Sequence, residues 1–546
     1  MADADYIIVG AGSAGCVLAG RLSEDPDVRV TLIEAGGRDR SPNIKVPLAF
    51  PKQFHTKLDW DYETDPEPAC NNRRLYIPRG KSLGGSSSMN AMLYVRGRPL
   101  DFDLWERAGA EGWGWEEVRP YFLRSENNTR GASEFHAAGG PLHVSDQRAP
   151  RPYASTLLCA SQAAGIPYVP DYNGPEQDGV SMFQVTQNRG RRWSTADAFL
   201  RPALERDNLE VVTRAQVLGL ELEGARVTGV RMAGGLRRRT RTLRAAREVI
   251  VCAGAINSPQ LLLLSGIGPE DELQRHGIEV RHALPGVGRN LHDHPFVTML
   301  WEVRSDETLF GAEKPIHLLE WALRRSGKLT SPAAEVCAFV RTRPGLPAAD
   351  IQFHMGALYF EDHGTEEHDA PAVVIGPVLV TPASRGSVTL RSADPTAKPR
   401  ILTNSLTEPE DVASMVAGME LAREIAAQEP MRSTVVRELK PGPSVSTRDD
   451  LEAALRERVE LIYHPVGTCR MGTDDDAVVD PALRVRGLEG LRVVDASVMP
   501  VITGGNTNAP TIMIAERAAD LIRGRIPAPV AAGWPTSRIP APVAVG

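Results

Sequence analysis

The N-terminal hydrophobic pattern predicts a strand, a helix and a second strand. Apolar residues at 6–9 form a short continuous run, as in a buried parallel strand. Small and apolar residues at 14–22 follow a helical pattern, and an Asp-Pro-Asp turn comes next. A second run, rich in β-branched residues, covers 28–33 and ends on Glu34. This order of elements is typical of the first β-α-β unit of a dinucleotide-binding sheet.

The rest of the pattern predicts further strands and a second sheet. Strands are expected at 208–213, 215–219, 225–232, 247–254 and 491–495, with helices at 101–125, 154–165, 258–265 and about 510–522. A second sheet is expected from 296–304, 335–341, 350–356, 372–380 and 386–391, with helices at 315–324, 408–427 and 448–459. Residues 38–78 show no clear period, and prolines in 525–546 predict an extended tail. With 546 residues, the chain is too long for one core, so at least two domains are expected.

Composition and charge narrow the class of protein. The apolar content of 42% and the charged content of 24% are ordinary for a globular chain. The net charge of −7 gives no support to binding of nucleic acid or of an anionic membrane. No apolar run reaches the roughly 20 residues of a transmembrane helix, and the first strand begins too early to leave room for a signal peptide. Six scattered cysteines fit free thiols, so we expect a cytoplasmic protein.

The first turn carries a glycine spacing that suits a dinucleotide. Gly10 permits the tight turn, Gly12 lets the backbone approach a pyrophosphate, and Gly15 allows close packing of helix and strand. The helix N-terminus that follows favours phosphate. Glu34 is positioned to accept hydrogen bonds from ribose hydroxyls and would repel a 2′-phosphate.

A second segment, 80–90, is rich in glycine and serine. Its successive N–H groups can form an anion-binding nest, and its glycines allow the backbone to lie flat against a cofactor. Leu83, Met89 and Leu93 give the segment apolar flanks, which argues against a flexible linker. We therefore expect this segment to contact the cofactor.

Several motifs occur in an order that resembles one family. They are the fingerprint at 10–15, the block at 80–90 with Tyr94 and Gly97, and the segments 254–260, 265–268, 290–294, 463–470, 494–497 and 506–510. Together they resemble the glucose–methanol–choline family of flavin oxidoreductases, in its choline-dehydrogenase-like alcohol dehydrogenase branch. The resemblance covers the chain up to Arg523. It implies FAD and a fold of mixed α/β and α+β class.

The same resemblance implies a domain division. Segments 1–150, 206–295 and 460–524 would form a discontinuous Rossmann-like FAD-binding domain. Segments 151–205 and 296–459 would form a substrate domain with an antiparallel sheet and helices.

The resemblance also implies which residues contact FAD. They are Gly10, Gly12, Ser13, Ala14, Gly15, Glu34, Ala35, Gly80, Ser82, Gly85, Ser86, Asn90, Ala91, Met92, Leu93, Val217, Asp495, Ala496 and Pro510. Some relatives attach FAD through a histidine immediately before the asparagine. This chain has Met89 at that position, so non-covalent FAD is predicted.

His464 and Asn508 are the predicted catalytic residues. Histidine can accept the hydroxyl proton near neutral pH while hydride leaves the adjacent carbon. By the family match, Asn508 would hold the substrate oxygen through its amide. Pro510 suits the first turn of a helix whose N-terminus would face the flavin. The predicted reaction is oxidation of a primary alcohol to its aldehyde, with electrons passed on to a quinone, a carrier or oxygen.

The substrate side leaves alternatives open. Glu335 and His354 could form a site for a cationic alcohol, although a salt-bridged or exposed glutamate is the favoured interpretation. The polar loop 359–369 could form a mobile rim. Residues 292–294 read His-Asp-His, but adjacent ligands on one loop seldom bind metal, so no metal is expected. The resemblance implies a domain-junction turn at this segment. Alternative functions are a flavin-holding lyase, a fatty-acid photodecarboxylase or an NAD(H)-dependent reductase.

Overall fold

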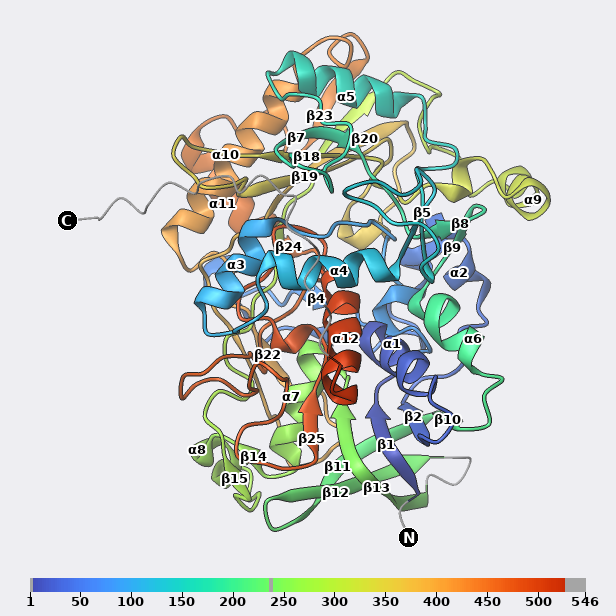
Figure 1. The fold of residues 1–546 in the computed structure, drawn as a ribbon. Coiled ribbons are helices and arrows are strands. Elements are labelled where there is room, and N and C mark those ends of the chain that lie inside the picture. Colours follow the sequence, from blue (N-terminus) through green and yellow to red (C-terminus); the bar gives the residue numbers. More distant parts are fainter. Residues whose placement is uncertain (1–2, 235–238, 526–546) are drawn as a thin grey trace.

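Two large β-sheets organise the chain, one near the bottom and one near the top of Figure 1. The computed structural model describes residues 3–234 and 239–525. Helix α12 (Asn508–Arg523), from the C-terminal end of the described chain, packs against α1 (Ser13–Leu22) and α4 (Trp115–Ser125). Residues far apart in sequence therefore share one core.

The first sheet has seven strands. They are β1 (Ala4–Val9), β2 (Val30–Glu34), β10 (Leu209–Thr213), β11 (Ala215–Glu223), β12 (Arg226–Gly234), β13 (Arg239–Val251) and β25 (Leu491–Val493). Their order is β10-β2-β1-β13-β12-β11, and β25 pairs with β13. The pairs made by β1, β2, β10 and β25 are parallel, whereas β11, β12 and the start of β13 form an antiparallel meander. Almost every residue of β1 and β2 is buried, which explains their continuous apolar runs.

The second sheet is antiparallel. Its strands are β7 (Gly179–Met182), β16 (Pro295–Phe296), β17 (Met299–Val303), β18 (Val336–Val340), β19 (Ile351–Gly356), β20 (Ala372–Leu379), β23 (Val435–Lys440) and β24 (Glu460–Leu461). The main order is β23-β17-β20-β19-β18-β7, and β16 pairs with both β20 and β24. Helices α10 (Pro409–Ala426) and α5 (Tyr153–Ala163) pack on this sheet and bury a second core.

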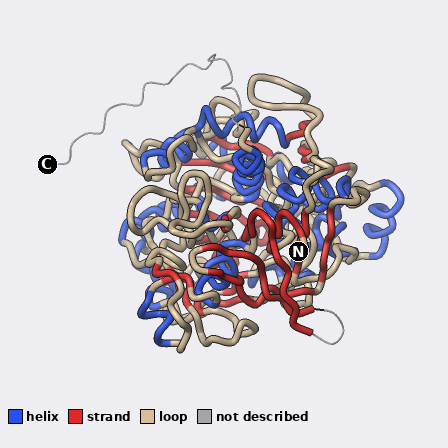
Figure 2. Tube along the Cα trace, turned by 60° about the horizontal axis from the view of Figure 1, so that its bottom comes forward, coloured by secondary structure: helices blue, strands red, loops and turns tan. Residues whose placement is uncertain are grey.

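Shorter elements and long loops connect the two sheets (Figure 2). The remaining helices are α2 (Pro42–Lys45), α3 (Pro99–Arg107), α6 (Arg201–Ala203), α7 (Gly254–Leu264), α8 (Glu270–Arg275), α9 (Pro315–Arg324) and α11 (Arg448–Arg458). Two-stranded ladders join β3 (Tyr62–Glu63) to β4 (Tyr76–Ile77), β5 (Glu126–Asn128) to β6 (Leu142–Val144), β8 (Gln187–Asn188) to β9 (Arg191–Arg192), β14 (Ile267–Gly268) to β15 (His282–Ala283) and β21 (Ser387–Thr389) to β22 (Arg400–Leu402).

The predicted mixed α/β and α+β fold is confirmed, but several elements differ from the prediction; helix α7, for example, begins at Gly254 and not at Ser258. The segment 386–391 does not join the second sheet, because β21 pairs only with β22. The last helix begins at Asn508, two residues before Pro510. Strands β7 and β23 were not predicted; β7 is four residues long, and exposed charged residues interrupt the alternation of β23. The predicted tail lies outside the described residues from position 526 onward.

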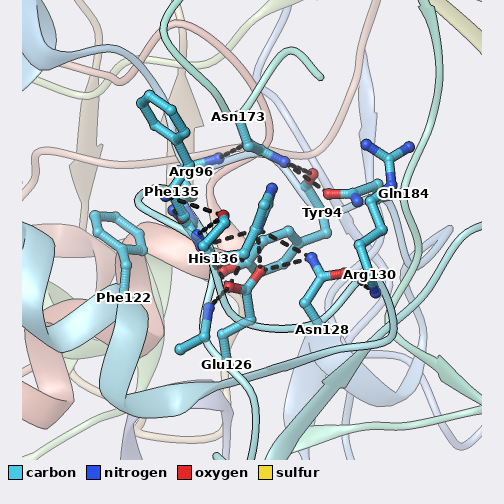
Figure 3. A network of polar contacts seen from close by, with 12 residues as sticks. Tyr94, Arg96, Phe122, Glu126, Asn128, Arg130, Phe135, His136, Asn173 and Gln184 are labelled. Carbon is cyan, nitrogen blue, oxygen red and sulfur yellow. Dashed lines mark hydrogen bonds and ion pairs between the residues drawn. The ribbon is translucent and has the colours of Figure 1, made fainter. Parts of the chain in front are cut away.

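A buried polar network joins the chain around Arg96, Glu126 and Asn173 (Figure 3). Arg96 and Glu126 form an ion pair of 2.6 Å, and both side chains are almost completely buried. Asn128 donates to Glu126 at 3.0 Å, and His136 contacts both Glu126 and Asp171. Burial alone lowers the pKa of His136, but its two carboxylate partners raise that pKa overall. Removing one partner of such a pair typically costs about 3–5 kcal/mol, so the network fixes the local backbone.

Candidate active site

One elongated cavity brings together most of the predicted site. Its walls come from the β1–α1 turn, the end of β2, segment 78–93, the start of β11, the start of α7, residues 332–334, residues 462–465 and the start of α12. The lining includes Gly10, Gly12, Ser13, Ala14, Glu34, Ala35, Gly80, Gly85, Ser86, Asn90, Ala91, Met92, Leu93, Val217, His354, His464, Asp495, Ala496 and Asn508. Gly15, Ser82, Glu335 and Pro510 are not part of the lining.

The glycine turn has the shape that a bound dinucleotide requires. Gly10 has a φ of +100°, and a Cβ there would lie 2.5 Å from the carbonyl oxygen of Cys252. A Cβ on Gly15 would lie 1.9 Å from the Gly10 oxygen, so Gly15 supports the turn by packing. Gly12 differs, because its nearest neighbour would be 4.0 Å away and its position lines the cavity. A side chain on Gly12 would therefore fill the space that a pyrophosphate would use.

The 80–90 segment lies directly against this first turn. The Gly84 N–H donates to the Ala11 carbonyl oxygen at 2.7 Å. A Cβ on Gly85 would lie 2.7 Å from the Gly12 Cα, so two glycine-rich turns meet back to back. Only backbone fits at this junction, which leaves a smooth wall for a flat cofactor.

Glu34 lies beside the first glycine turn and lines the cavity. Its carboxylate accepts from the Ala11 N–H at 2.9 Å and from the Gly36 N–H at 2.7 Å. Burial raises the pKa of Glu34 to about 7, and the two backbone donors oppose that rise. Each oxygen retains accepting capacity for a ribose hydroxyl.

His464 also lines the cavity and contacts a second histidine. Its Nδ1 lies 3.0 Å from Nδ1 of His294, and the two rings are nearly perpendicular. Its backbone N–H donates to Asp293 at 2.7 Å, which also accepts from the His294 N–H. Its Nε2 lies 3.2 Å from Nδ2 of Asn506. Contacts to both ring nitrogens and to the backbone N–H thus hold His464 in place.

These contacts define which nitrogen of His464 can act as a base. Gln352 Nε2 donates to the Asn506 carbonyl oxygen at 3.3 Å, which turns the Asn506 NH₂ group toward His464. An NH₂ group can only donate, so Nε2 of His464 carries the lone pair. Nδ1 then carries the hydrogen and donates it to His294.

Burial keeps the His464 imidazole neutral. It lowers the pKa of His464 well below 6.5, and nearby His294 and His354 lower it further. Burial likewise lowers the pKa of His294 to about 3 and that of His354 to about 3. A neutral imidazole is the form that accepts a proton.

The rate of flavin reduction should therefore show no titration of the base between about pH 6 and 9. A histidine of ordinary pKa, near 6.5, would lose activity on acidification through that value. Here the depressed pKa moves that loss to lower pH, because His464 stays unprotonated. Stopped-flow reduction measured from pH 5.5 to 9 checks this, and a rate that falls with a midpoint near 6.5 would contradict it.

The two asparagines near the N-terminus of α12 make different contacts. Asn508 is the first residue of the helix and lines the cavity, but its Oδ1 accepts from Ser13 Oγ at 2.7 Å. Asn506, which the sequence analysis did not select, contacts the imidazole. Pro510 is the third residue of α12, where a missing N–H is still harmless because the first four have no helical partner.

Asp495 fixes the end of β25 beside the cavity. It accepts from Ser258 Oγ at 2.5 Å and from the Gly254 N–H at 2.8 Å. Its other oxygen accepts from the Ser497 N–H at 2.8 Å. The N-terminal end of α7 and the C-terminal strand are thereby joined at the cavity wall.

Glu335 and His354 do not converge on one site. His354 lines the cavity, with its ring edge-on to Phe183. The Glu335 carboxylate accepts from the backbone N–H of Arg151 at 2.8 Å and lies outside the lining. Glu335 and His354 therefore do not together provide a binding site for a cationic substrate.

Aromatic residues that the sequence analysis did not select enclose the cavity near His464. They are Phe50, Phe54, Trp60, Phe296, Phe360 and Tyr463. The rings of Phe54 and Tyr463 meet edge to face at 5.9 Å, and Phe50 contacts Phe54 at 6.0 Å. These rings give the cavity an apolar wall; Tyr463 belongs to the segment 463–470, and Phe360 to the loop 359–369, that the sequence analysis singled out.

Across 3–234 and 239–525, no group of three or more His, Cys, Asp or Glu side chains could hold a metal ion. Within the same ranges, no helix is long and apolar enough to cross a bilayer.

Comparison with known proteins identifies the family. The GMC oxidoreductase N-terminal family model matches residues 4–296, and the C-terminal family model matches 382–515. An alcohol dehydrogenase [acceptor] of Pseudomonas putida is 44% identical over 526 residues, 95% of each chain. An oxygen-dependent choline dehydrogenase of Brucella ovis is 43% identical over 544 residues, 96% of each chain.

Solved structures agree with these matches. Pyridoxine 4-oxidase from Mesorbium loti superposes with a TM-score of 0.88 at 33% identity, covering 96% of this chain and 100% of that one. A formate oxidase gives a TM-score of 0.90 at 28% identity, covering 95% and 98%. The matched residues include both glycine-rich turns and the segment around His464. The chain belongs to the glucose–methanol–choline (GMC) oxidoreductase family.

Proposed function

We propose that this protein oxidises a neutral primary alcohol to its aldehyde, with FAD as cofactor and His464 as base. The observation that carries the proposal is one cavity that is lined both by two glycine-rich turns and by a neutral imidazole. FAD is the cofactor of the family, and when bound it supplies the acceptor for the hydride. The first sheet and its loops would hold FAD, and the second sheet would carry the substrate side.

The residues at the glycine end fit the dinucleotide part of FAD. Gly12 leaves room for the pyrophosphate, because a Cβ there would have no neighbour closer than 4.0 Å, and the N-terminus of α1 offers free N–H groups to it. Glu34 accepts from the ribose hydroxyls. The N-terminus of α12, with Asn508 as its first residue, would favour negative charge at the flavin edge.

The proton leaves the alcohol through His464. Its Nε2 takes the hydroxyl proton as hydride departs from the adjacent carbon, and the substrate oxygen replaces the Asn506 NH₂ group at that nitrogen. His294 continues to accept the Nδ1 hydrogen, which holds the ring in place. Asn506 and Asn508 lie on either side of the helix start and orient the substrate oxygen by donating to it.

The cavity walls favour a neutral and partly apolar alcohol. Glu335 is outside the lining, and the aromatic rings of Phe50, Phe54 and Tyr463 provide apolar contact instead.

The Pseudomonas relative is named for an alcohol and an unspecified acceptor, so a quinone, a carrier or oxygen could receive the electrons. A lyase or photodecarboxylase reaction has no comparable support among these relatives. All six cysteines are free, which supports a cytoplasmic location.

Anaerobic bleaching of the flavin by a panel of alcohols tests the proposed function. Neutral primary alcohols with apolar or aromatic groups should bleach the flavin faster than quaternary-ammonium alcohols of equal size. The faster substrate should give the matching aldehyde in a 1:1 ratio to reduced flavin. No bleaching by any alcohol would overturn the proposal, and faster bleaching by the cationic alcohols would overturn its substrate class.

Acid precipitation tests the attachment of the flavin. Met89 lines the cavity at the position of the attaching histidine in some relatives, and a thioether side chain cannot form that bond. All of the yellow colour should therefore pass to the supernatant. Flavin that stays in the washed pellet would contradict non-covalent binding.

A further inference from the structure

Arg192, in strand β9, is a buried cation without an ion pair. The residue is 1% exposed, and no carboxylate within the described ranges forms an ion pair with it. The other buried arginines of the described chain each pair with a carboxylate: Arg96 with Glu126, Arg98 with Asp101 and Arg492 with Glu248. A buried charge is costly unless a counter-charge lies beside it. Arg192 is therefore the one buried arginine of the described chain whose charge is not balanced beside it.

The guanidinium of Arg192 donates to neutral oxygens around the glycine- and serine-rich segment. Strand β9 lies beside α2 (Figure 1), and Nε of Arg192 donates to the Ile44 carbonyl oxygen of that helix at 2.8 Å. Nη1 donates to the Ser87 carbonyl oxygen at 3.2 Å and to Oδ1 of Asn90 at 2.7 Å. Nη2 has no hydrogen-bond partner in the described part of the chain. Asn90 lines the cavity and Arg192 does not, so the cation contacts the cavity wall from its protein side.

These contacts orient the amide of Asn90. Its Oδ1 accepts from Arg192 and also from the Met92 N–H at 3.1 Å, so both of its lone pairs are in use. The NH₂ group is the other end of the amide, and within the described residues no acceptor is hydrogen-bonded to it. A hydrogen bond from a cation polarises an amide and strengthens its N–H donors. Because Asn90 lines the cavity, these donors are available to a molecule bound there.

The charged side chains near Arg192 carry one more positive than negative charge. Burial lowers the pKa of Arg192 to about 9, and Asp197 opposes this effect. Asp197, however, already pairs with Lys45 and Arg201, each at 3.1 Å, and both of these cations also pair with Asp39. Three cations thus share two carboxylates in a chain whose net charge is −7. This group therefore favours an anion in the neighbouring cavity.

We propose that Arg192 is a positioning residue for FAD: it holds the Asn90 NH₂ group toward the cofactor and balances part of the cofactor's negative charge. This role rests on the FAD site of the proposed function. Two sources of negative charge are available, the pyrophosphate of FAD and the flavin ring once it is reduced. A charge in a buried site acts on its counter-charge more strongly than in water. Arg192 thus raises the affinity for FAD through the first source and the midpoint potential of the flavin through the second.

Titration of the full-length apoprotein with FAD tests the role of the charge. Arg192→Met should bind FAD roughly 10- to 100-fold more weakly than the parent, the scale of a lost hydrogen bond to a charged group. Arg192→Lys keeps the charge and should recover most of that affinity, although an ammonium group cannot copy the planar fork of donors. Equal losses in both variants would assign Arg192 to the support of the local backbone alone and overturn the proposal.

Arg201→Met is the matched control. It removes a cation of the same group, but one that is 50% exposed and pairs with two carboxylates. This variant should bind FAD as the parent does, because exposed ion pairs contribute little. A loss as large as that of Arg192→Met would show a general effect of charge and overturn the proposal.

ADP binding and the midpoint potential of the bound flavin distinguish the two sources of negative charge. If Arg192 balances the pyrophosphate, Arg192→Met should weaken ADP binding by the same factor as FAD binding. If Arg192 balances the reduced flavin, ADP binding should stay at the parent value and the midpoint potential should become more negative. Parent-like affinity together with a parent-like potential in Arg192→Met would overturn the proposal.

Asn90→Asp gives a second test that leaves Arg192 in place. The new carboxylate would lie where Oδ1 now accepts from Nη1 at 2.7 Å, so the cation gains a counter-charge. The apoprotein should therefore melt at a higher temperature than the parent apoprotein, while its affinity for FAD should fall because the NH₂ donors are gone. An apoprotein that melts lower, or parent-like FAD binding, would overturn the proposal. A parent apoprotein that takes up no FAD would overturn the proposed function together with this role of Arg192.

Discussion

Replacing His464 with alanine should slow anaerobic flavin reduction by roughly 100-fold or more, the usual scale of a lost general base. His464 lines the cavity, and its contacts leave Nε2 as a proton acceptor. Neither Asn506 nor Asn508 can replace it, because an amide does not accept a proton at neutral pH. Stopped-flow absorbance with one good alcohol measures the effect.

The control for this variant is its flavin content. His464 does not touch the glycine turns, so the ratio of flavin to protein should remain that of the parent. Asn506→Ala and Asn508→Ala should each slow reduction less, because they remove orientation and leave the base in place. A His464→Ala protein that reduces its flavin at the parent rate would refute the proposed mechanism.

Among the substitutions described, Gly12→Val should cause the largest loss of affinity for FAD. The Gly12 backbone is in an extended conformation that valine also adopts, and a Cβ there meets no protein atom closer than 4.0 Å. The apoprotein can therefore fold, while the added methyl groups occupy the space proposed for the pyrophosphate. Overpacking of about 1–3 kcal/mol corresponds to a roughly 10- to 100-fold loss of affinity.

Titration of the apoprotein with FAD, followed by quenching of flavin fluorescence, measures this loss. Gly37→Val is the matched control, because its Cβ would have its nearest neighbour at 3.7 Å and the residue lies outside the cavity lining. Both apoproteins should melt near the parent apoprotein. Parent-like FAD affinity in Gly12→Val would show that the dinucleotide lies elsewhere.

Hydrophobic runs and glycine spacing predicted those elements of the fold that depend on residues close together in sequence. The β1–α1–β2 unit was predicted to within two residues at most boundaries, since its apolar runs and its glycine spacing are strong signals. Most strands of the second sheet and helices α9, α10 and α11 were also predicted. The segment 386–391 was predicted as a strand correctly but assigned to the wrong sheet, because pairing partners are set by tertiary structure.

The residues around His464 show why the rest of the site was missed. His294 lies 170 positions away in sequence and was predicted only as part of a turn, yet it contacts the imidazole. Asn506 and Asn508 are two residues apart, and only the backbone path into α12 decides which amide faces His464. Phe50, Phe54 and Trp60 come from a segment without periodicity, so no pattern placed them at the cavity.

The C-terminal end of the described chain completes the N-terminal sheet, and this has a consequence for biosynthesis. Strand β25 pairs with β13, and Asn508 bonds to Ser13 across 495 positions. While the ribosome is still making residues 491–523, the β1–α1 turn lacks one side of its pocket. Cofactor loading therefore has to wait until residues 491–523 have been made and have packed against the first sheet, so the protein passes through an apo state. Cellular flavin supply would then set how much of the newly made protein survives proteolysis, because ligand binding stabilises only the folded chain.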